Sequence, residues 1–224
     1  MAGRILSIQN LEIQSQSSIV VHPFNIELDL GQGIIIYGLN NSGKSLICET
    51  IFASYNQIKG TIKVCDFSLN PISPTDKANL RRKLGYASQV SQLLPHKTVR
   101  VNLLMAINAS DKFKDIPSET LILEHLNLFD LSHSLKTEFG ALSYSQQKLI
   151  SFIRAIIHKP KFLVLDGLME GLDSKYHEII IEKLEQLVLK DNLSYLITSH
   201  SAQKLPFLHA KSFEIIDNKL VSLN

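Results

Sequence analysis

The stretch that decides the fold is Gly38-Leu39-Asn40-Asn41-Ser42-Gly43-Lys44-Ser45, which fits the phosphate-loop pattern Gly-x-x-x-x-Gly-Lys-Ser/Thr. In such a loop, backbone N–H groups approach phosphate oxygens closely, and glycine leaves room for that approach. Lys44 places a positive charge near the β and γ phosphates, and Ser45 offers a hydroxyl to Mg²⁺. The following helix, which includes Leu46, turns its positive N-terminal end toward the anion. We therefore predict that this stretch binds a nucleoside triphosphate together with Mg²⁺.

The sequence on both sides of the loop supports this prediction. Residues 34–37 form a short, apolar, β-branched run that ends at Gly38. Residues 45–52 carry apolar side chains at 47, 48, 51 and 52, which is the spacing of one face of a helix. Strand, loop and helix therefore follow one another in the order that the motif requires.

The composition suits one α/β domain over residues 1–224. The chain is 45% hydrophobic, which is enough to bury a sizeable core. Its net charge is +2, from 23 basic and 21 acidic residues, and this balance gives no electrostatic reason to expect a nucleic acid as partner. The two cysteines, Cys48 and Cys65, have no metal-binding or redox spacing, and we expect two reduced, buried thiols.

No apolar run approaches the roughly 20 residues that a membrane-spanning helix needs. The first residues are not followed by the apolar stretch of a secretory signal. We therefore expect a cytoplasmic protein that is peripheral on the inner face of a membrane only through a partner.

Two parts of the chain differ in their periodicity. Residues 4–30 alternate apolar and polar side chains, as at Phe24, Ile26 and Leu28, and predict an antiparallel β-layer ahead of the phosphate loop. Over residues 71–160 helical spacing dominates, with one helix capped by Thr98 and another after Ser118, and prolines separate the pieces. We interpret this range as a helical subdomain inserted into the nucleotide-binding core.

The second half of the chain brings further polar residues to the ends of predicted elements. Ser143 and Gln146 fit a capping box, so a helix is expected to begin there. The apolar strand 162–165 delivers Asp166 at its C-terminal end, where ligands bind in open parallel sheets. The strand 195–198 brings His200 to the same edge, after a helix that Ser174 caps. A hairpin of residues 212–216 and 220–223 closes an α/β fold with a mixed sheet.

In this order, the motifs resemble those of the ATP-binding subunit of an ABC (ATP-binding cassette) transporter, and the resemblance covers nearly the whole chain. Residues 80–85 and 93–99 most resemble the subgroup that serves cell-division and lipoprotein-release complexes. The matching segments are 38–45 for the phosphate loop, 86–89 for the Q-loop, 142–146 for the LSGGQ signature, 162–166 for the Walker B strand, 171–173 for the D-loop and 199–200 for the switch histidine.

The resemblance implies a P-loop NTPase core that binds ATP and Mg²⁺. It also implies an integral membrane permease-type partner and a second ATP-binding subunit, identical or not, in a head-to-tail dimer. By resemblance, Ser45, Gln89 and Asp166 are the Mg²⁺ ligands, and His200 and Gln89 act on the γ-phosphate or the attacking water. Three residues of the signature region would contact the ATP of the opposite subunit: Ser143, Ser145 and Gln146.

The chain also departs from the family pattern. Gly167 stands where the family has the Glu that serves as general base, so hydrolysis is expected to be slow, since such a base contributes about 10²- to 10⁴-fold. Glu170 is the nearest carboxylate and a candidate substitute. Tyr144 and Ser145 replace the two signature glycines, and a side chain as large as Tyr should hinder approach to a γ-phosphate. No aromatic residue stands where the family stacks adenine.

Two functional hypotheses remain open. In the first, the chain is an ATPase subunit in which ATP closes a dimer, the Q-loop moves a membrane partner, and hydrolysis reopens the dimer. In the second, it is a nucleotide-gated scaffold that hardly hydrolyses ATP, or the degenerate half of an asymmetric dimer. Gly167 and Tyr144 favour the second hypothesis, whereas Lys44, Asp166 and His200 favour retained binding under both. A small-molecule kinase would leave the signature and the switch histidine without a purpose.

Overall fold

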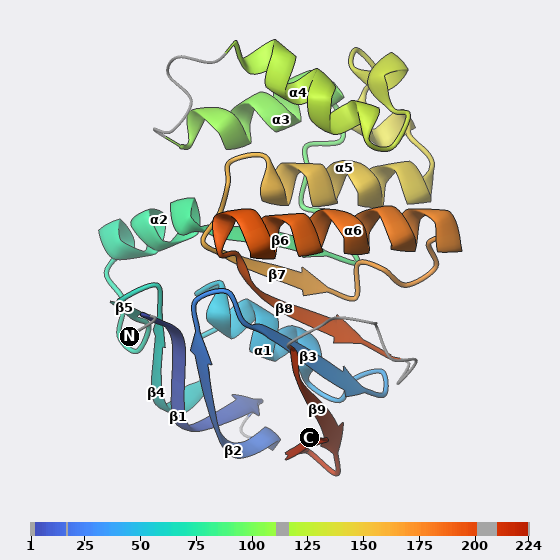
Figure 1. The fold of residues 1–224 in the computed structure, drawn as a ribbon. Coiled ribbons are helices and arrows are strands. Elements are labelled where there is room, and N and C mark those ends of the chain that lie inside the picture. Colours follow the sequence, from blue (N-terminus) through green and yellow to red (C-terminus); the bar gives the residue numbers. More distant parts are fainter. Residues whose placement is uncertain (1–2, 17, 111–116, 201–209, 224) are drawn as a thin grey trace.

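The computed structural model describes residues 3–16, 18–110, 117–200 and 210–223, and it contains two β-sheets with a helical layer above them (Figure 1). The antiparallel sheet has the order β2-β1-β4-β5. Its strands are β1 (Arg4–Ser15), β2 (Ser18–Asp29), β4 (Ile58–Val64) and β5 (Phe67–Ser68). This sheet is the N-terminal β-layer that the alternation predicted.

The larger sheet has the order β10-β9-β3-β8-β7-β6, and its strands run parallel except that β10 is antiparallel to β9. The strands are β3 (Gly33–Gly38), β6 (Leu84–Ser88), β7 (Phe162–Asp166), β8 (Ser194–Ser199), β9 (Ala210–Ile216) and β10 (Lys219–Ser222). All residues of β3 and β7 are buried, as expected for parallel strands that are covered on both faces. The mixed sheet and the antiparallel layer confirm the predicted α/β fold.

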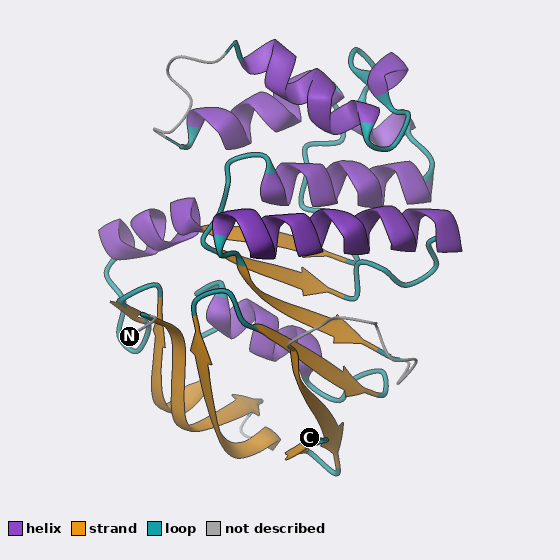
Figure 2. Cartoon of the chain, viewed as in Figure 1, coloured by secondary structure: helices purple, strands orange, loops and turns teal. Residues whose placement is uncertain are grey.

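Helices cover the larger sheet, and Figure 2 shows them gathered on the side away from the antiparallel layer. They are α3 (Val99–Asn108), α4 (Ser118–Asn127), α5 (Tyr144–Ile156) and α6 (Ser174–Asp191), with the short 3₁₀ turns η2 (Ser132–Ser134) and η3 (Phe139–Ala141). Helix α2 (Pro74–Lys83) instead packs through its buried Leu80 into the core between the two sheets. Helix α1 (Lys44–Ile51) differs, because it lies between the two sheets.

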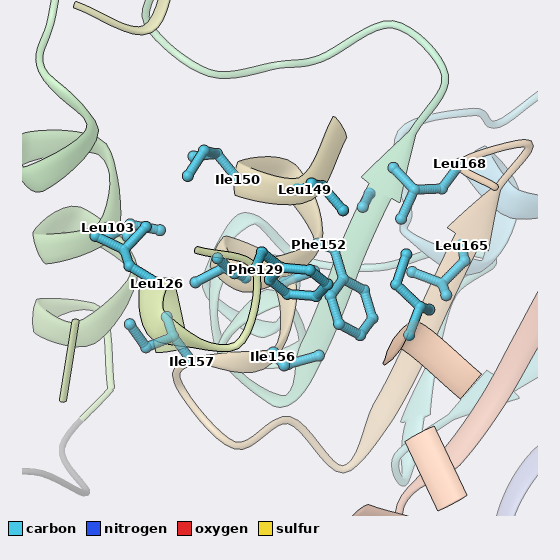
Figure 3. Close-up of a cluster of buried hydrophobic side chains, with 14 of the residues drawn as sticks. Leu103, Leu126, Phe129, Leu149, Ile150, Phe152, Ile156, Ile157, Leu165 and Leu168 are labelled. Atoms are coloured by element: carbon cyan, nitrogen blue, oxygen red, sulfur yellow. The ribbon is translucent and has the colours of Figure 1, made fainter. Parts of the chain in front are cut away.

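Two apolar cores hold these layers together. In the first, Ile47 and Ile51 of α1 pack between Ile8 of β1 and Val164 of β7, and all four are fully buried. The second lies between the larger sheet and the helices; Figure 3 shows Phe152 of α5 near its centre. Phe129 meets the Phe152 ring edge-on with 6.0 Å between centroids, a favourable aromatic geometry.

The parallel strands place four chain segments at one edge of the larger sheet. The register pairs Asp166 at the end of β7 with Thr198 of β8, and Tyr37 near the end of β3 with Ser199. Ser88 at the end of β6 pairs with Asp166 from the other side. The loops that follow these strands therefore meet, as predicted for Asp166 and His200.

Several local predictions are confirmed. Ser143 and Gln146 form the capping box at the start of α5, and the Thr98 side chain caps α3. The C-terminal hairpin is present as β9 and β10. Cys48 and Cys65 are both buried, free thiols.

Two predictions need correction. The range 71–160 is not helical throughout, because it contains β6, which is a strand of the larger sheet beside β7. Its sequence, Leu84-Gly85-Tyr86-Ala87-Ser88, is too short and too rich in small residues to show against helical neighbours. Helix α6 has Asp173, not Ser174, at its N-cap; Ser174 is the first helical residue.

Candidate nucleotide-binding site

The phosphate loop connects the buried strand β3 to helix α1, which begins at Lys44. Gly43 has φ +100°, a left-handed conformation that suits glycine. A Cβ at Gly43 would lie only 2.7 Å from Val21 Cγ2 of β2, so space as well as conformation requires glycine here. The antiparallel sheet therefore presses directly on the loop.

Lys44 is buried, with 6% of its surface exposed, and its ammonium folds back over the loop. The Nζ atom donates to Gly38 O at 2.6 Å and to Leu39 O at 2.7 Å, and it lies 3.3 Å from His200 Nδ1. Burial lowers the pKa of Lys44, while the carboxylates of Glu170 and Asp166 act in the opposite direction. The residue is thus a buried positive charge placed where the motif predicts a phosphate contact.

Asp166 ends the buried strand β7, and the neighbouring strand β8 orients it. Thr198 Oγ1 donates to Asp166 Oδ1 at 2.8 Å and accepts from the Gly167 N–H at 2.9 Å. The Gln89 N–H donates to Asp166 O at 2.8 Å, which brings the Q-loop segment beside the acid. Sequence reasoning did not find Thr198, although its place at the end of the adjacent parallel strand was a usable signal.

His200 connects Lys44 to Glu170. Its backbone N–H donates to Glu170 Oε1 at 2.7 Å, and its Nε2 lies 2.7 Å from Glu170 Oε2. Because the Lys44 ammonium is a donor, His200 Nδ1 accepts, which places the ring proton on Nε2 facing Glu170. The reach of Glu170 was open from the sequence; the structure brings its carboxylate to the switch histidine.

These groups line one cavity of about 410 Å³, which is within the usual range for a small-molecule site. Among the predicted residues at its wall are the following: Asn40, Asn41, Ser42, Gly43, Lys44, Ser45, Leu46, Gln89, Asp166 and His200. Gly38 and Leu39 contribute through the carbonyl groups that bind Lys44. Ser15 and Val20 line the side formed by the antiparallel sheet.

A profile of the ABC transporter family matches residues 21–169, which include the phosphate loop, the Q-loop, the signature and Asp166. The chain belongs to the ABC transporter family. It is an ATP-binding domain of this family, as the sequence predicted, and members of the family bind ATP.

Relatives of this ABC domain serve several systems. The ergothioneine transport ATP-binding protein EgtV of Helicobacter pylori is 25% identical over 94% of this chain and 97% of its own length. The cell division ATP-binding protein FtsE of Streptococcus pneumoniae is 28% identical over 88% and 85%. The lipoprotein-releasing system ATP-binding protein LolD of Francisella tularensis is 25% identical over 90% and 87%.

Solved ATP-binding cassettes share the fold of this ABC domain. A dimeric cassette in a post-hydrolysis state, bound to ADP and Pi, matches with a TM-score of 0.86 at 21% identity and covers 96% of both chains. The cbiO1 protein from Clostridium perfringens, part of the ABC transporter complex cbiONQ, matches with a TM-score of 0.77 at 19% identity over 97% and 87%. Within the described ranges of this ABC domain, no helix has the length and apolar composition that crossing a membrane requires.

The signature region of this ABC domain lies at the start of α5, away from the cavity wall. The Ser143 N–H donates to Gln146 Oε1 at 2.9 Å, and Ser143 Oγ accepts from the Gln146 N–H at 3.3 Å. Both side chains thus cap their own helix. Tyr144 is 55% exposed, and the Lys148 ammonium lies 4.7 Å from its ring centroid. The structure therefore does not bring Ser143, Ser145 and Gln146 to the site of their own chain.

Gly167, which replaces the family's glutamate, has φ +58°, in the left-handed region. A Cβ at this position would lie 3.8 Å from Gln89 Cβ and 3.9 Å from Glu170 Cδ, which are ordinary contact distances. The carboxyl group of Glu170 therefore lies next to the space that a side chain at 167 would enter. The turn after β7 brings the two positions together, since the Glu170 N–H approaches Gly167 O at 3.4 Å.

Proposed function

We propose that this chain is the ATP-binding subunit of a transporter-type complex. It binds Mg·ATP in the cavity at the end of β3 and couples this binding to a conformational change in a membrane partner. The observation that carries the proposal is the joint lining of one cavity by Lys44, Asp166, Gln89 and His200. These residues come from four separate segments, so their meeting is a property of the fold and not of one motif.

The residues present also suit Mg²⁺. Ser45 and Asp166 supply the hydroxyl and carboxylate oxygens that this hard cation prefers, and Gln89 supplies an amide oxygen at the same cavity. The Thr198 hydroxyl fixes the Asp166 carboxylate by a 2.8 Å hydrogen bond. A bound ion would offset part of the negative charge of the triphosphate. We propose Ser45, Gln89 and Asp166 as its protein ligands.

Calorimetry with Mg·ATP tests the binding step. The wild-type chain should release heat on binding, and Lys44→Ala should abolish binding because it removes the buried charge of the loop. Lys219→Ala, at an exposed position of β10, is the matched control and should bind as wild type does. No heat with the folded wild-type chain would refute the proposal.

For hydrolysis, we propose that His200 and Gln89 contact the γ-phosphate and the attacking water, and that Glu170 supplies the carboxylate that Gly167 lacks. The support is geometric. The Glu170 carboxylate accepts two hydrogen bonds from His200 and lies beside the position of the missing side chain. Acting through His200, Glu170 keeps the ring proton on Nε2 and leaves Nδ1 as an acceptor.

The second candidate is a nucleotide-gated scaffold, or the degenerate half of an asymmetric dimer. Gly167 favours it, because the group that normally takes the proton from water is missing. Under this alternative, Mg·ATP binds and closes the protein but stays intact, and a second, competent subunit supplies hydrolysis where it is needed.

Single-turnover hydrolysis separates the two candidates. A rate that Lys44→Ala abolishes, and that Glu170→Gln lowers by about 10²- to 10⁴-fold, supports the ATPase. Bound ATP that remains intact over hours supports the scaffold. A Lys44-dependent rate that Glu170→Gln does not change would refute the role of Glu170 while leaving the ATPase standing.

We further propose that the chain acts beside a membrane, on its cytoplasmic face, through a permease-type subunit and a second ATP-binding subunit. A groove of about 390 Å³ between α2, α3 and α5 supports a docked partner segment. Arg81, Arg82 and Arg154 line it beside the apolar side chains of Met105 and Ala106. Because Gln92 of the Q-loop region also lines the groove, motion at Gln89 has a short path to a segment docked there.

A further inference from the structure

Lys148 is an unusual residue in this core. It lies on α5 with 2% of its surface exposed, and no ion pair to it is present in the described part of the chain. Its Nζ donates to the backbone carbonyl of Glu170 and lies 4.7 Å from the centroid of the Tyr144 ring. Burying an ammonium is costly, and an apolar residue of similar length would fill the same space without that cost. A specific use of the charge therefore explains its presence better than packing does.

The carbonyl that accepts from Lys148 belongs to Glu170, whose carboxylate binds His200. Glu170 is fixed at its backbone by the Lys148 ammonium and at its carboxylate by two hydrogen bonds to His200. The preceding residue, Met169, is held as well, since its carbonyl lies 2.6 Å from His177 Nε2. The turn after β7 is thus tied to α5 on one side and to the triphosphate cavity on the other.

We propose that Lys148 is a positioning residue, which holds the Glu170 turn so that its carboxylate orients His200 toward Lys44. This inference deepens the proposed nucleotide function and rests on it. A series of contacts connects the first turn of α5 to the phosphate loop through Lys148, Glu170 and His200. Tyr144 belongs to the same unit, because its ring face partly replaces water around the ammonium.

The orientation of His200 supplies a readout that needs no catalysis. Nitrogen-15 NMR of the His200 side chain in the wild-type chain should show one tautomer, with the proton on Nε2. Lys148→Met keeps the volume but removes the donor, so the Glu170 turn should loosen and both tautomers should appear. Lys148→Arg keeps the charge and a donor and should restore the wild-type spectrum. A wild-type spectrum in Lys148→Met would overturn the proposal.

Kinetics give the second readout. Lys148→Met should lower kcat by about 100-fold, the effect of displacing an orienting group by about 1 Å, and should change the Kd for Mg·ATP by less than about twofold. Lys148→Arg should recover most of the rate. Equal losses of binding and rate, or no loss of rate in a hydrolysing wild-type chain, would contradict a positioning role.

A matched control separates this role from general damage to the fold. Lys183 on α6 is partly buried and takes no part in the Glu170 contacts, so Lys183→Met should leave the His200 spectrum unchanged. If the wild-type chain fails to bind Mg·ATP, the proposed function falls while the NMR comparison still decides the Lys148 proposal. If it binds ATP without hydrolysing it, the tautomer result alone decides.

Discussion

At the scale of single residues, Gly167 differs from the family's glutamate in backbone freedom as well as in chemistry. With φ of +58° at Gly167, the chain turns so that Glu170 lies beside this position. The position of the Glu170 carboxylate therefore depends on the turn that glycine permits. A glutamate at position 167 would carry a Cβ in the left-handed conformation, which costs about 1–2 kcal/mol. We therefore expect Gly167→Glu to be a poor imitation of the family's base.

The strain itself can be measured. Gly167→Ala should lower the free energy of unfolding by about 1–2 kcal/mol, because alanine disfavours the left-handed conformation, whereas Gly167→Asn should cost less. Gly3→Ala is the control, since its Cβ would meet only Leu30 Cδ1 at an ordinary 3.5 Å. Chemical denaturation of the three variants provides the comparison. Equal stability of Gly167→Ala and wild type would contradict the left-handed turn.

A buried thiol predicts a pH effect. Burial raises the pKa of Cys65 to about 11, so the folded chain keeps this proton where the unfolded chain loses it. The associated stability is present below pH 9 and is lost as the pH rises from about 9 to 11. Cys65→Ala should flatten the fall in unfolding free energy over that window, measured by urea titration at several pH values. The same slope in both proteins would exclude this contribution.

At the scale of elements, α5 begins with an uncommon residue. Tyr144 stands at the first helical position, where family members have the small signature glycine, and it is half exposed over Lys148. Its backbone is not left-handed, so conformation does not require glycine at this site. We therefore propose that glycine serves the family at this position by leaving space for a partner's phosphate.

This gives a prediction for assembly. The wild-type chain should dimerise poorly with Mg·ATP, because a side chain as large as Tyr144 should hinder the approach of the opposite nucleotide, and Tyr144→Gly should strengthen the dimer. Tyr144→Phe, which keeps the ring, is the matched control and should behave as wild type does. Size-exclusion chromatography with Mg·ATP gives the measurement. A tight wild-type dimer would refute the idea.

The elements also show how far sequence alone reaches. The buried strands β3 and β7 and the capped helix α5 were predictable, since each carries a continuous apolar run or a complete cap. Strand β6 was not, because five residues with glycine and alanine give too weak a pattern. In the site, Lys44 was predictable from the phosphate-loop motif, and Asp166 was predictable from its place at the end of an apolar strand. The contacts of Glu170 and Lys148 depend on one turn and one helix face meeting in space, which no local pattern encodes.

At the scale of the whole molecule, the arginine-lined groove is where charge can select a partner. Arg81 and Arg82 are exposed on α2, and Arg81 stacks on Phe52 with 4.7 Å to the ring centroid. No acidic residue is among the side chains that line the groove in the described ranges. A complementary partner segment is expected to carry carboxylates.

Reversing these charges should weaken that association. The double variant Arg81→Glu and Arg82→Glu should reduce co-purification from membranes by at least about tenfold, because like charges would then face each other. Lys63→Glu, on the exposed side of β4, is the control and should leave co-purification intact. Calorimetry with Mg·ATP checks that the double variant still folds. Undiminished recovery of the same membrane proteins would place the contact elsewhere.

The position of α1 between the two sheets has a consequence for how the protein melts. The loop ahead of this helix contacts both sheets: Val21 of the antiparallel sheet would lie 2.7 Å from a Cβ at Gly43, and Gly38 is the last residue of β3 in the larger sheet. Loosening either layer is therefore expected to move the phosphate loop. Heat should therefore erase ligand affinity and both apolar interiors in one cooperative step, and saturating nucleotide should shift that single transition upward as a whole.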